Sequence, residues 1–294
     1  MPADILPVGC PPSTSPIALV HRPAKGRRGL ACWLALPAEI SNDAPPLVAV
    51  HGIRRRAREQ VRLFADRAAQ LGRPIVAPLF DAQVWPRYQQ VVRRGRADLA
   101  LLGLLRELRL LGLWRTRHFD LFGYSGGAQF AHRFAMLYPQ LVNRLIVASA
   151  GWYTFPEPAP FPYGVAAGPG RTGQWGPRLG AGLDRFLRLP IDVCVGAADT
   201  VSDDSTRRGS EIDRQQGGDR VARAHAWHRA LREAAAGRGV TSRAALTVLP
   251  DAGHDFQDCV RRGGLDKIVL PDREEWPPVS RRPPWAEVET LQTR

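Results

Sequence analysis

Gly123-Tyr124-Ser125-Gly126-Gly127 is a Gly-x-Ser-x-Gly pattern that lies between a short apolar run at 118–122 and a helix-like pattern. After the motif, apolar residues recur with the period of a helix as far as Leu137, and Pro139 ends the pattern. A serine at so sharp a turn takes strained backbone angles, and the glycines around it let strand and helix pack closely. This context predicts a nucleophile elbow with Ser125 as the nucleophile.

The chain around the elbow alternates between short apolar runs and helical stretches. Such alternation predicts an α/β fold with a mostly parallel sheet and helices on both of its faces. Two opening runs, 17–20 and 30–36, are expected to form a hairpin whose turn is 25–29, which gives eight strands in all. The other expected strands are 47–50, 75–79, 118–122, 145–148, 191–195 and 245–249, and the clearest helices are 57–71, 97–111, 128–137 and 220–235.

A single domain over 1–294 is the simplest organisation for this pattern. Residues 1–16 are a proline-rich leader, and 271–294 are a tail rich in proline and charge. Residues 153–182 contain many prolines and glycines and no sustained period, yet they include four aromatic residues. A long irregular insertion with aromatic residues predicts a small, irregular cap that packs on the domain.

A serine hydroxyl needs a base to accept its proton and an acid to orient that base. Asp199 follows the run 191–195, and His254 follows the run 245–249. Both therefore lie beyond the carboxyl ends of expected parallel strands, as Ser125 does. The chain order Ser, Asp, His is the order that accompanies this type of elbow. We therefore expect Ser125, His254 and Asp199 to form a catalytic triad.

Each of these residues has an alternative. Ser125 is also a good helix N-cap residue, although a cap does not require glycine on both sides. The competing acids and bases are Asp192, Asp203, Asp204, His132, His225 and His228.

Cleavage of an ester or amide produces an oxyanion, which backbone N–H groups stabilise. The Gly126 amide follows the nucleophile and is the first expected donor. The second comes from the turn after 47–50, where we assign it to Ile53, with Gly52 as the alternative. His51 at the start of this turn is expected to be structural.

Trp152 and Tyr153 follow the run 145–148 and are predicted to form an apolar wall for the substrate. Burial in the core below the cap is the alternative for these two residues. Arg54, Arg55 and Arg56 lie near the mouth of the expected pocket. They either attract an acidic substrate or are solvated arginines of an arginine-rich chain.

The formal net charge is +13, yet only Lys25 and Lys267 are lysines among 41 basic residues. This arginine bias, with abundant alanine and glycine, is typical of a GC-rich genome, and most of the arginines are expected to be solvated. No specific nucleic-acid partner is expected. The four cysteines are far apart and lack metal-ligand spacing, so no metal site is expected.

The N-terminal residues contain no basic segment followed by a long apolar run, and no stretch is long enough to span a membrane. The expected location is the cytoplasm. A secretion signal that had already been removed would leave the same sequence.

The His51-Gly52 turn, the elbow at 123–127 and the Asp199 and His254 loops together resemble the α/β-hydrolase superfamily over roughly residues 17–265. Within it, the elbow and Gly151-Trp152-Tyr153 are most similar to bacterial esterases and polyhydroxybutyrate depolymerases. The resemblance implies cofactor-free hydrolysis of a small-molecule carboxylic ester through an acyl-enzyme. The alternatives are an acyltransferase, a peptidase or a carbon–carbon hydrolase with the same triad, and a non-catalytic binder of anionic polymers.

Overall fold

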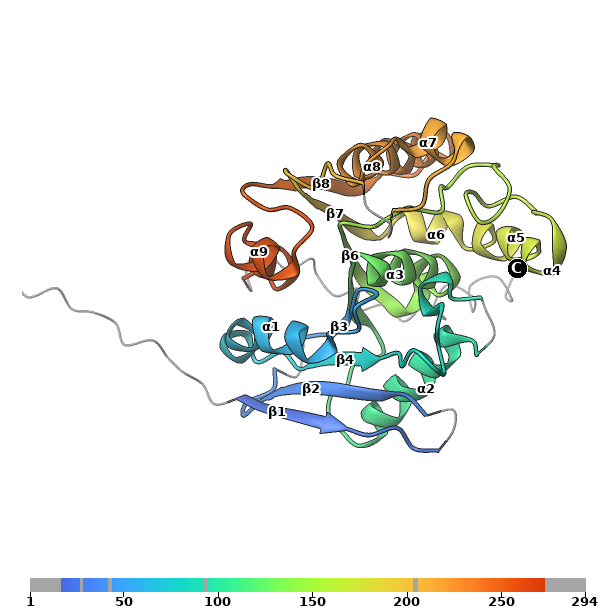
Figure 1. Ribbon diagram of the computed structural model, residues 1–294. Helices are drawn as coiled ribbons and strands as arrows, with labels where there is room; N and C mark the ends of the chain where they lie inside the picture. Colours follow the sequence, from blue (N-terminus) through green and yellow to red (C-terminus); the bar gives the residue numbers. More distant parts are fainter. Residues whose placement is uncertain (1–16, 27–28, 42–43, 93–94, 203–205, 273–294) are drawn as a thin grey trace, which may run out of the picture.

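The computed structural model describes residues 17–26, 29–41, 44–92, 95–202 and 206–272, and these build one eight-stranded sheet (Figure 1). The strand order is β1-β2-β4-β3-β5-β6-β7-β8. β1 pairs antiparallel with β2 and β2 antiparallel with β4, whereas all other neighbours are parallel. The strands are β1 Ile17–Arg22, β2 Ala31–Pro37, β3 Leu47–Val50, β4 Ile75–Leu79, β5 Phe119–Tyr124, β6 Val142–Ala148, β7 Pro190–Gly196 and β8 Arg243–Leu249.

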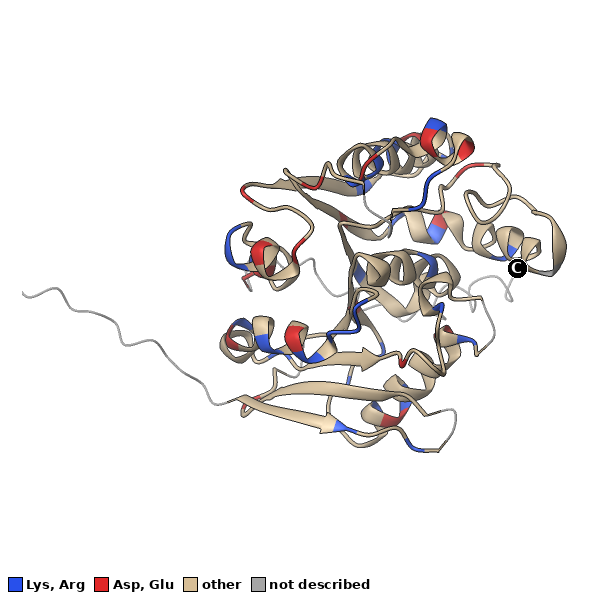
Figure 2. Cartoon of the chain, in the orientation of Figure 1, with Lys and Arg blue, Asp and Glu red and all other residues tan. Residues whose placement is uncertain are grey.

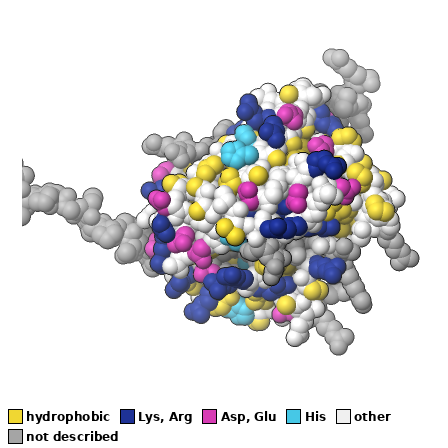
Figure 3. Space-filling view, turned by 45° about the horizontal axis from the view of Figure 1, so that its top comes forward, with side chains coloured by type: hydrophobic (Ala, Val, Ile, Leu, Met, Phe, Trp, Pro, Cys, Tyr) yellow, Lys and Arg dark blue, Asp and Glu magenta, His cyan; other side chains and the backbone are white. Residues whose placement is uncertain are grey.

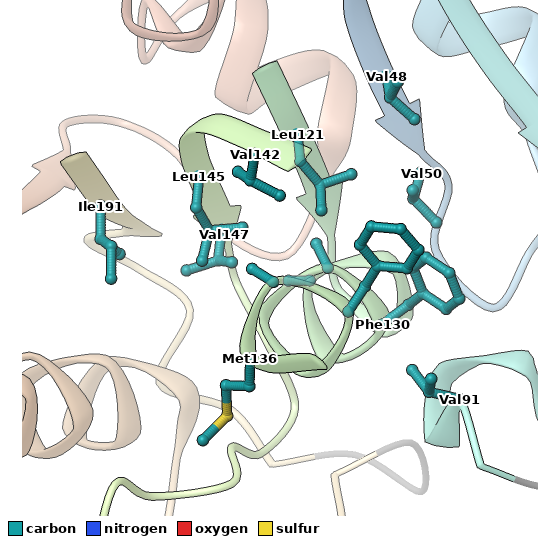
Figure 4. Close-up of a cluster of buried hydrophobic side chains, with 14 of the residues drawn as sticks. Val48, Val50, Val91, Leu121, Phe130, Met136, Val142, Leu145, Val147 and Ile191 are labelled. Atoms are coloured by element: carbon teal, nitrogen blue, oxygen red, sulfur yellow. The ribbon is translucent and has the colours of Figure 1, made fainter. Parts of the chain in front are cut away.

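Helices cover both faces of the sheet, so the central strands are buried on both sides. On one face, α2, α3 and α8 pack over Leu121 of β5, and Figure 4 shows Phe130 and Met136 of α3 below the strand side chains. On the other face, α1, α9 and α10 pack over Phe122. The long helices are α1 Ala57–Leu71, α2 Ala97–Leu110, α3 Gly126–Leu137 and α8 Arg220–Ala236, and the short ones are α4 Gly170–Gly173, α5 Trp175–Gly180, α6 Leu183–Leu187, α7 Ser210–Gln216, α9 Phe256–Arg261 and α10 Leu265–Val269.

The predicted fold class is confirmed by this sheet. All eight strands lie where the sequence places them, and the β1–β2 hairpin is antiparallel. Residues 27 and 28 of the predicted turn, the leader 1–16 and residues 273–294 of the tail lie outside the described residues.

The segment 153–182 is more ordered than a structureless loop. It contains α4 and α5, and α5 packs against α3. Phe155, Phe161 and Leu179 are buried in the same core as α3. The aromatic and aliphatic side chains of this segment therefore serve packing on the α3 face of the sheet.

Candidate active site

Ser125 connects β5 to α3 with a positive φ of 54° and a ψ of −113°. Such a conformation is strained for a residue with a side chain. The glycines around it are required by close backbone approaches. A Cβ at Gly127 would lie 2.0 Å from the Val50 carbonyl oxygen of β3, and one at Gly123 would lie 2.2 Å from the Gly127 oxygen. The elbow is thus wedged against the neighbouring strand.

The structure brings Ser125, His254 and Asp199 into one hydrogen-bonded chain. His254 Nδ1 lies 2.8 Å from Asp199 Oδ2, and His254 Nε2 lies 3.1 Å from Ser125 Oγ. A carboxylate only accepts hydrogen bonds, so Nδ1 carries the proton and Nε2 accepts from the serine hydroxyl. Asp199 is only 2% exposed, whereas His254 is partly exposed. This geometry allows His254 to take the Ser125 proton.

A residue that the sequence reasoning missed completes the environment of Asp199. Arg220, the first residue of α8, is buried and places Nη1 3.3 Å from Asp199 Oδ1. The two carboxylate oxygens therefore have different partners, one on His254 and one on Arg220. One feature of the sequence indicated this position for Arg220. It directly follows Asp219, which is a good N-cap residue and caps α8.

Two backbone amides without a partner in the described part of the chain lie close to each other beside the serine. The Ile53 nitrogen lies 3.3 Å from the position that a Cβ on Gly126 would take. Gly126 is the first residue of α3, so its N–H has no partner within the helix. Within the described residues, neither the Ile53 N–H nor the Gly126 N–H donates a hydrogen bond. Both remain available to an external oxygen atom.

His51 holds the loop that carries Ile53. Its Nδ1–H donates to the Gly52 carbonyl at 2.8 Å, and its Nε2 accepts from the Phe80 N–H at 3.1 Å. Burial lowers the pKa of His51 to about 4. Tyr88 donates to the His51 carbonyl at 2.5 Å. With both ring nitrogens occupied, His51 has the structural role predicted for it.

A cavity of about 310 Å³ opens beside Ser125 and His254. It lies between the loop after β3, the elbow and the loop after β8. Its lining is mostly apolar around the serine, with charged side chains at the rim. The lining residues are His51, Gly52, Ile53, Arg54, Arg56, Glu59, Gln60, Tyr124, Ser125, His254, Asp255 and Phe256.

Trp152 and Tyr153 do not line this cavity, which differs from the predicted substrate wall. Both are buried. The Tyr153 ring stacks on Trp227 with centroids 4.5 Å apart, and the Trp152 ring lies against the Arg133 guanidinium at 4.1 Å. Packing on the α3 and α8 side draws these rings into the core, which was the alternative considered from the sequence.

The competing acids and bases have other surroundings. Asp192 forms an ion pair with Arg144 at 2.7 Å, and Asp203 and Asp204 lie outside the described residues. The ring of His132 is buried between α3 and the segment after β6, where it donates to the Ala128 carbonyl and accepts from the Thr154 N–H. His225 and His228 lie on α8, apart from the cavity lining.

Most of the arginines were expected to be solvated, and among the described residues a small group of them is buried instead. Four arginines are buried, and each has carbonyl or carboxylate acceptors: Arg73, Arg133, Arg220 and Arg223.

The described helices include none that is both long enough and apolar enough to cross a membrane.

No protein-family model matches the chain, and no curated protein is similar to it in sequence. Solved structures are similar. Poly(aspartic acid) hydrolase-1 from Sphingomonas sp. KT-1 is 23% identical, with a TM-score of 0.72 over 86% of this chain and 98% of that one. LpqC, a poly(3-hydroxybutyrate) depolymerase from Bordetella parapertussis, is 23% identical, with a TM-score of 0.71 over 94% of each chain.

An S-formylglutathione hydrolase from Agrobacterium tumefaciens is more distant, at 14% identity and a TM-score of 0.52 over 85% of this chain and 93% of that one. At these identities the likeness concerns the fold. Together with the strand order, it establishes the α/β-hydrolase fold for this chain.

Proposed function

We propose that this protein is a serine hydrolase that cleaves a carboxylic ester through an acyl-enzyme intermediate. The observation that carries the proposal is the hydrogen-bonded chain from Ser125 through His254 to Asp199, which opens into the cavity. The names of the similar structures, which include a depolymerase and an S-formylglutathione hydrolase, are those of hydrolases and support the same chemistry.

In the first step, Ser125 Oγ attacks the ester carbonyl carbon while His254 Nε2 takes the hydroxyl proton. Asp199 accepts from Nδ1–H and stabilises the imidazolium that forms. The carbonyl oxygen becomes an oxyanion between the Ile53 and Gly126 amides, the second of which belongs to the positive end of α3. His254 then gives its proton to the departing alkoxide, and the alcohol leaves.

Deacylation repeats these steps with water. His254 Nε2 takes a proton from a water molecule, whose oxygen attacks the acyl carbon of the ester on Ser125. The tetrahedral intermediate collapses, and His254 returns the proton to Ser125 Oγ. The carboxylic acid is released and the enzyme is restored, so no cofactor enters the scheme.

A fluorophosphonate probe tests the nucleophile, with p-nitrophenyl butyrate as the substrate. We expect one covalent adduct on Ser125, and Ser125→Ala should lose both the adduct and, by roughly 10⁴-fold or more, the turnover. Ser149→Ala is the matched control, because Ser149 is a buried serine beside the elbow that stays outside the hydrogen-bonded chain. An adduct at another residue, or turnover that survives in Ser125→Ala, would reject the proposal.

Product analysis separates the ester hydrolase from enzymes with the same triad. Esters, thioesters, amides and β-diketones are offered together with an alcohol as a competing acceptor. We expect free acid from the esters as the main product. A preference for amides indicates a peptidase, cleavage of the diketone a carbon–carbon hydrolase, and transfer to the alcohol an acyltransferase.

A further inference from the structure

Three consecutive arginines lie between β3 and α1, and Figure 2 shows this loop in blue. The Arg55 side chain is held by the protein itself. Its Nη1 donates to the Ile53 carbonyl at 2.8 Å, and its Nη2 donates to the Trp85 carbonyl at 3.3 Å and the Pro86 carbonyl at 3.4 Å. The Arg55 backbone has a positive φ of 56°. Arg55 therefore anchors the loop and does not line the cavity.

The charged side chains that line the cavity differ in whether another group of the protein contacts them. Arg56 lies 3.6 Å from Glu59, so these two charges compensate each other. The Asp255 carboxylate accepts a hydrogen bond from the Asp258 N–H and caps α9. Arg54 forms neither a hydrogen bond nor an ion pair with any residue in the described part of the chain. Among the described residues, it is thus the cavity-lining arginine without a protein partner.

Arg54 also follows Ile53 directly, and the Ile53 amide is a proposed oxyanion donor. An arginine guanidinium is a planar fork that matches a carboxylate, and it stays charged at every relevant pH. A group that it binds would be held within one side-chain length of the reacting carbonyl.

From this arrangement we infer that the substrate carries a carboxylate and that Arg54 binds it. The inference rests on the proposed ester hydrolysis at Ser125 and defines its substrate class as anionic esters. The carboxylate belongs either to the acyl half or to the alcohol half, and two pairs of esters distinguish these sources.

The competing explanation is the overall positive charge of the protein, which attracts any anion at low salt. Arg58 provides the matched control. It lies four residues after Arg54, is exposed and rests over the Trp33 ring at 5.1 Å, away from the cavity. Arg58→Gln removes the same charge as Arg54→Gln without changing the rim.

The experiment compares kcat/KM within each pair of esters. The acyl pair is p-nitrophenyl butyrate and mono-p-nitrophenyl succinate, and the alcohol pair is phenyl butyrate and para-carboxyphenyl butyrate. In one pair we expect the native enzyme to prefer the anionic ester. Arg54→Gln should lower that preference about tenfold, because a charge-assisted hydrogen bond to a carboxylate is lost. Arg58→Gln should retain it.

The results separate this inference from the proposed function. If the native enzyme cleaves none of the esters, the proposed function fails. If it cleaves them without preferring an anionic member, only the role of Arg54 is overturned. An equal loss of preference in Arg58→Gln and Arg54→Gln would also overturn it, because the effect would then come from overall charge.

Discussion

At the scale of single residues, Arg220 and His254 share the carboxylate of Asp199. The Arg220 guanidinium compensates the charge on one oxygen of Asp199 while His254 uses the other. If the arginine is replaced by an uncharged residue, Asp199 Oδ1 loses its hydrogen-bond donor in a buried position, and the carboxylate is held by His254 alone. Arg220 is therefore expected to be a positioning residue that keeps the carboxylate in place.

The other groups that face Asp199 are neutral near neutral pH. They are the phenols of Tyr124 and Tyr153 and the thiol of Cys259. Burial raises the pKa of both phenols and raises the pKa of Cys259 to about 12. Among the described residues, Arg220 is thus the arginine that faces this carboxylate.

We predict that Arg220→Met lowers kcat of ester hydrolysis by about tenfold and leaves KM nearly unchanged, because the carboxylate that orients His254 is held by one partner fewer. Arg220→Lys keeps a cation at this position and should restore most of kcat. The measurement is steady-state hydrolysis of p-nitrophenyl butyrate, with urea denaturation of each variant as the control for folding. A fall in kcat that only follows the loss of folded protein would mean that Arg220 serves folding alone.

At the scale of elements, the packing of α3 against β3 depends on the second glycine after Ser125. A Cβ at Gly127 would lie 2.0 Å from the Val50 carbonyl oxygen, and backbone cannot yield as a flexible side chain does. We predict that Gly127→Ala destabilises the protein by about 2 kcal/mol or more. Urea denaturation measures this change.

Gly103 in the interior of α2 is the matched control for this prediction. Nothing lies within 4 Å of the Cβ that alanine would add there. Because alanine is a better helix former, Gly103→Ala should stabilise the protein by up to about 1 kcal/mol. Equal effects of the two substitutions would contradict the packing argument.

The sequence predicts the exact first and last residues of the elements whose sequence patterns are strongest. β3, β4 and α1 have the predicted bounds. The apolar runs of β3 and β4 are continuous, and Gly72 ends α1 in a left-handed conformation. The short helices of the segment 153–182 were missed, since each has too few residues to display a period. The sequence did not decide whether Trp152 lines the pocket or lies in the core, because an apolar ring is suited to both places.

In the candidate site too, residues with a local sequence pattern were predicted, and residues whose position depends on packing were not. Ser125, Asp199 and His254 come from motifs at strand ends, where topology alone brings them together. Arg220 was missed because its burial depends on the packing of α8, and one arginine among many carries no local mark. Of the charged residues that line the cavity, Arg56 was placed near its mouth from the sequence, whereas Glu59 was not assigned.

At the scale of the whole molecule, the formal net charge is +13, but the basic side chains do not form one continuous patch on the face that Figure 3 shows. On that face, basic side chains are interspersed with acidic and hydrophobic ones. A surface for nucleic acid normally concentrates its cations along one groove or stripe. The arrangement on this face therefore favours the catalytic hypothesis over the anionic-polymer binder.

The response of the whole fold to acid depends on two buried histidines. Burial lowers the pKa of His51 to about 4 and lowers that of His132 well below its usual range. In each ring, Nδ1–H donates to a carbonyl and Nε2 accepts a backbone N–H. Protonation would place a second donor against that N–H, so the native state keeps both rings neutral.

Below the unfolded pKa of about 6.5, the unfolded chain binds protons at these rings that the native state does not bind. The free energy of unfolding should therefore fall as pH is lowered from about 6.5 toward 4, by about 1 kcal/mol per pH unit for each histidine. Urea denaturation at several pH values measures the slope. His132→Gln is predicted to reduce it, whereas His225→Gln, at an exposed position on α8, should retain the native slope. An unchanged slope in His132→Gln would show that another group drives the acid response.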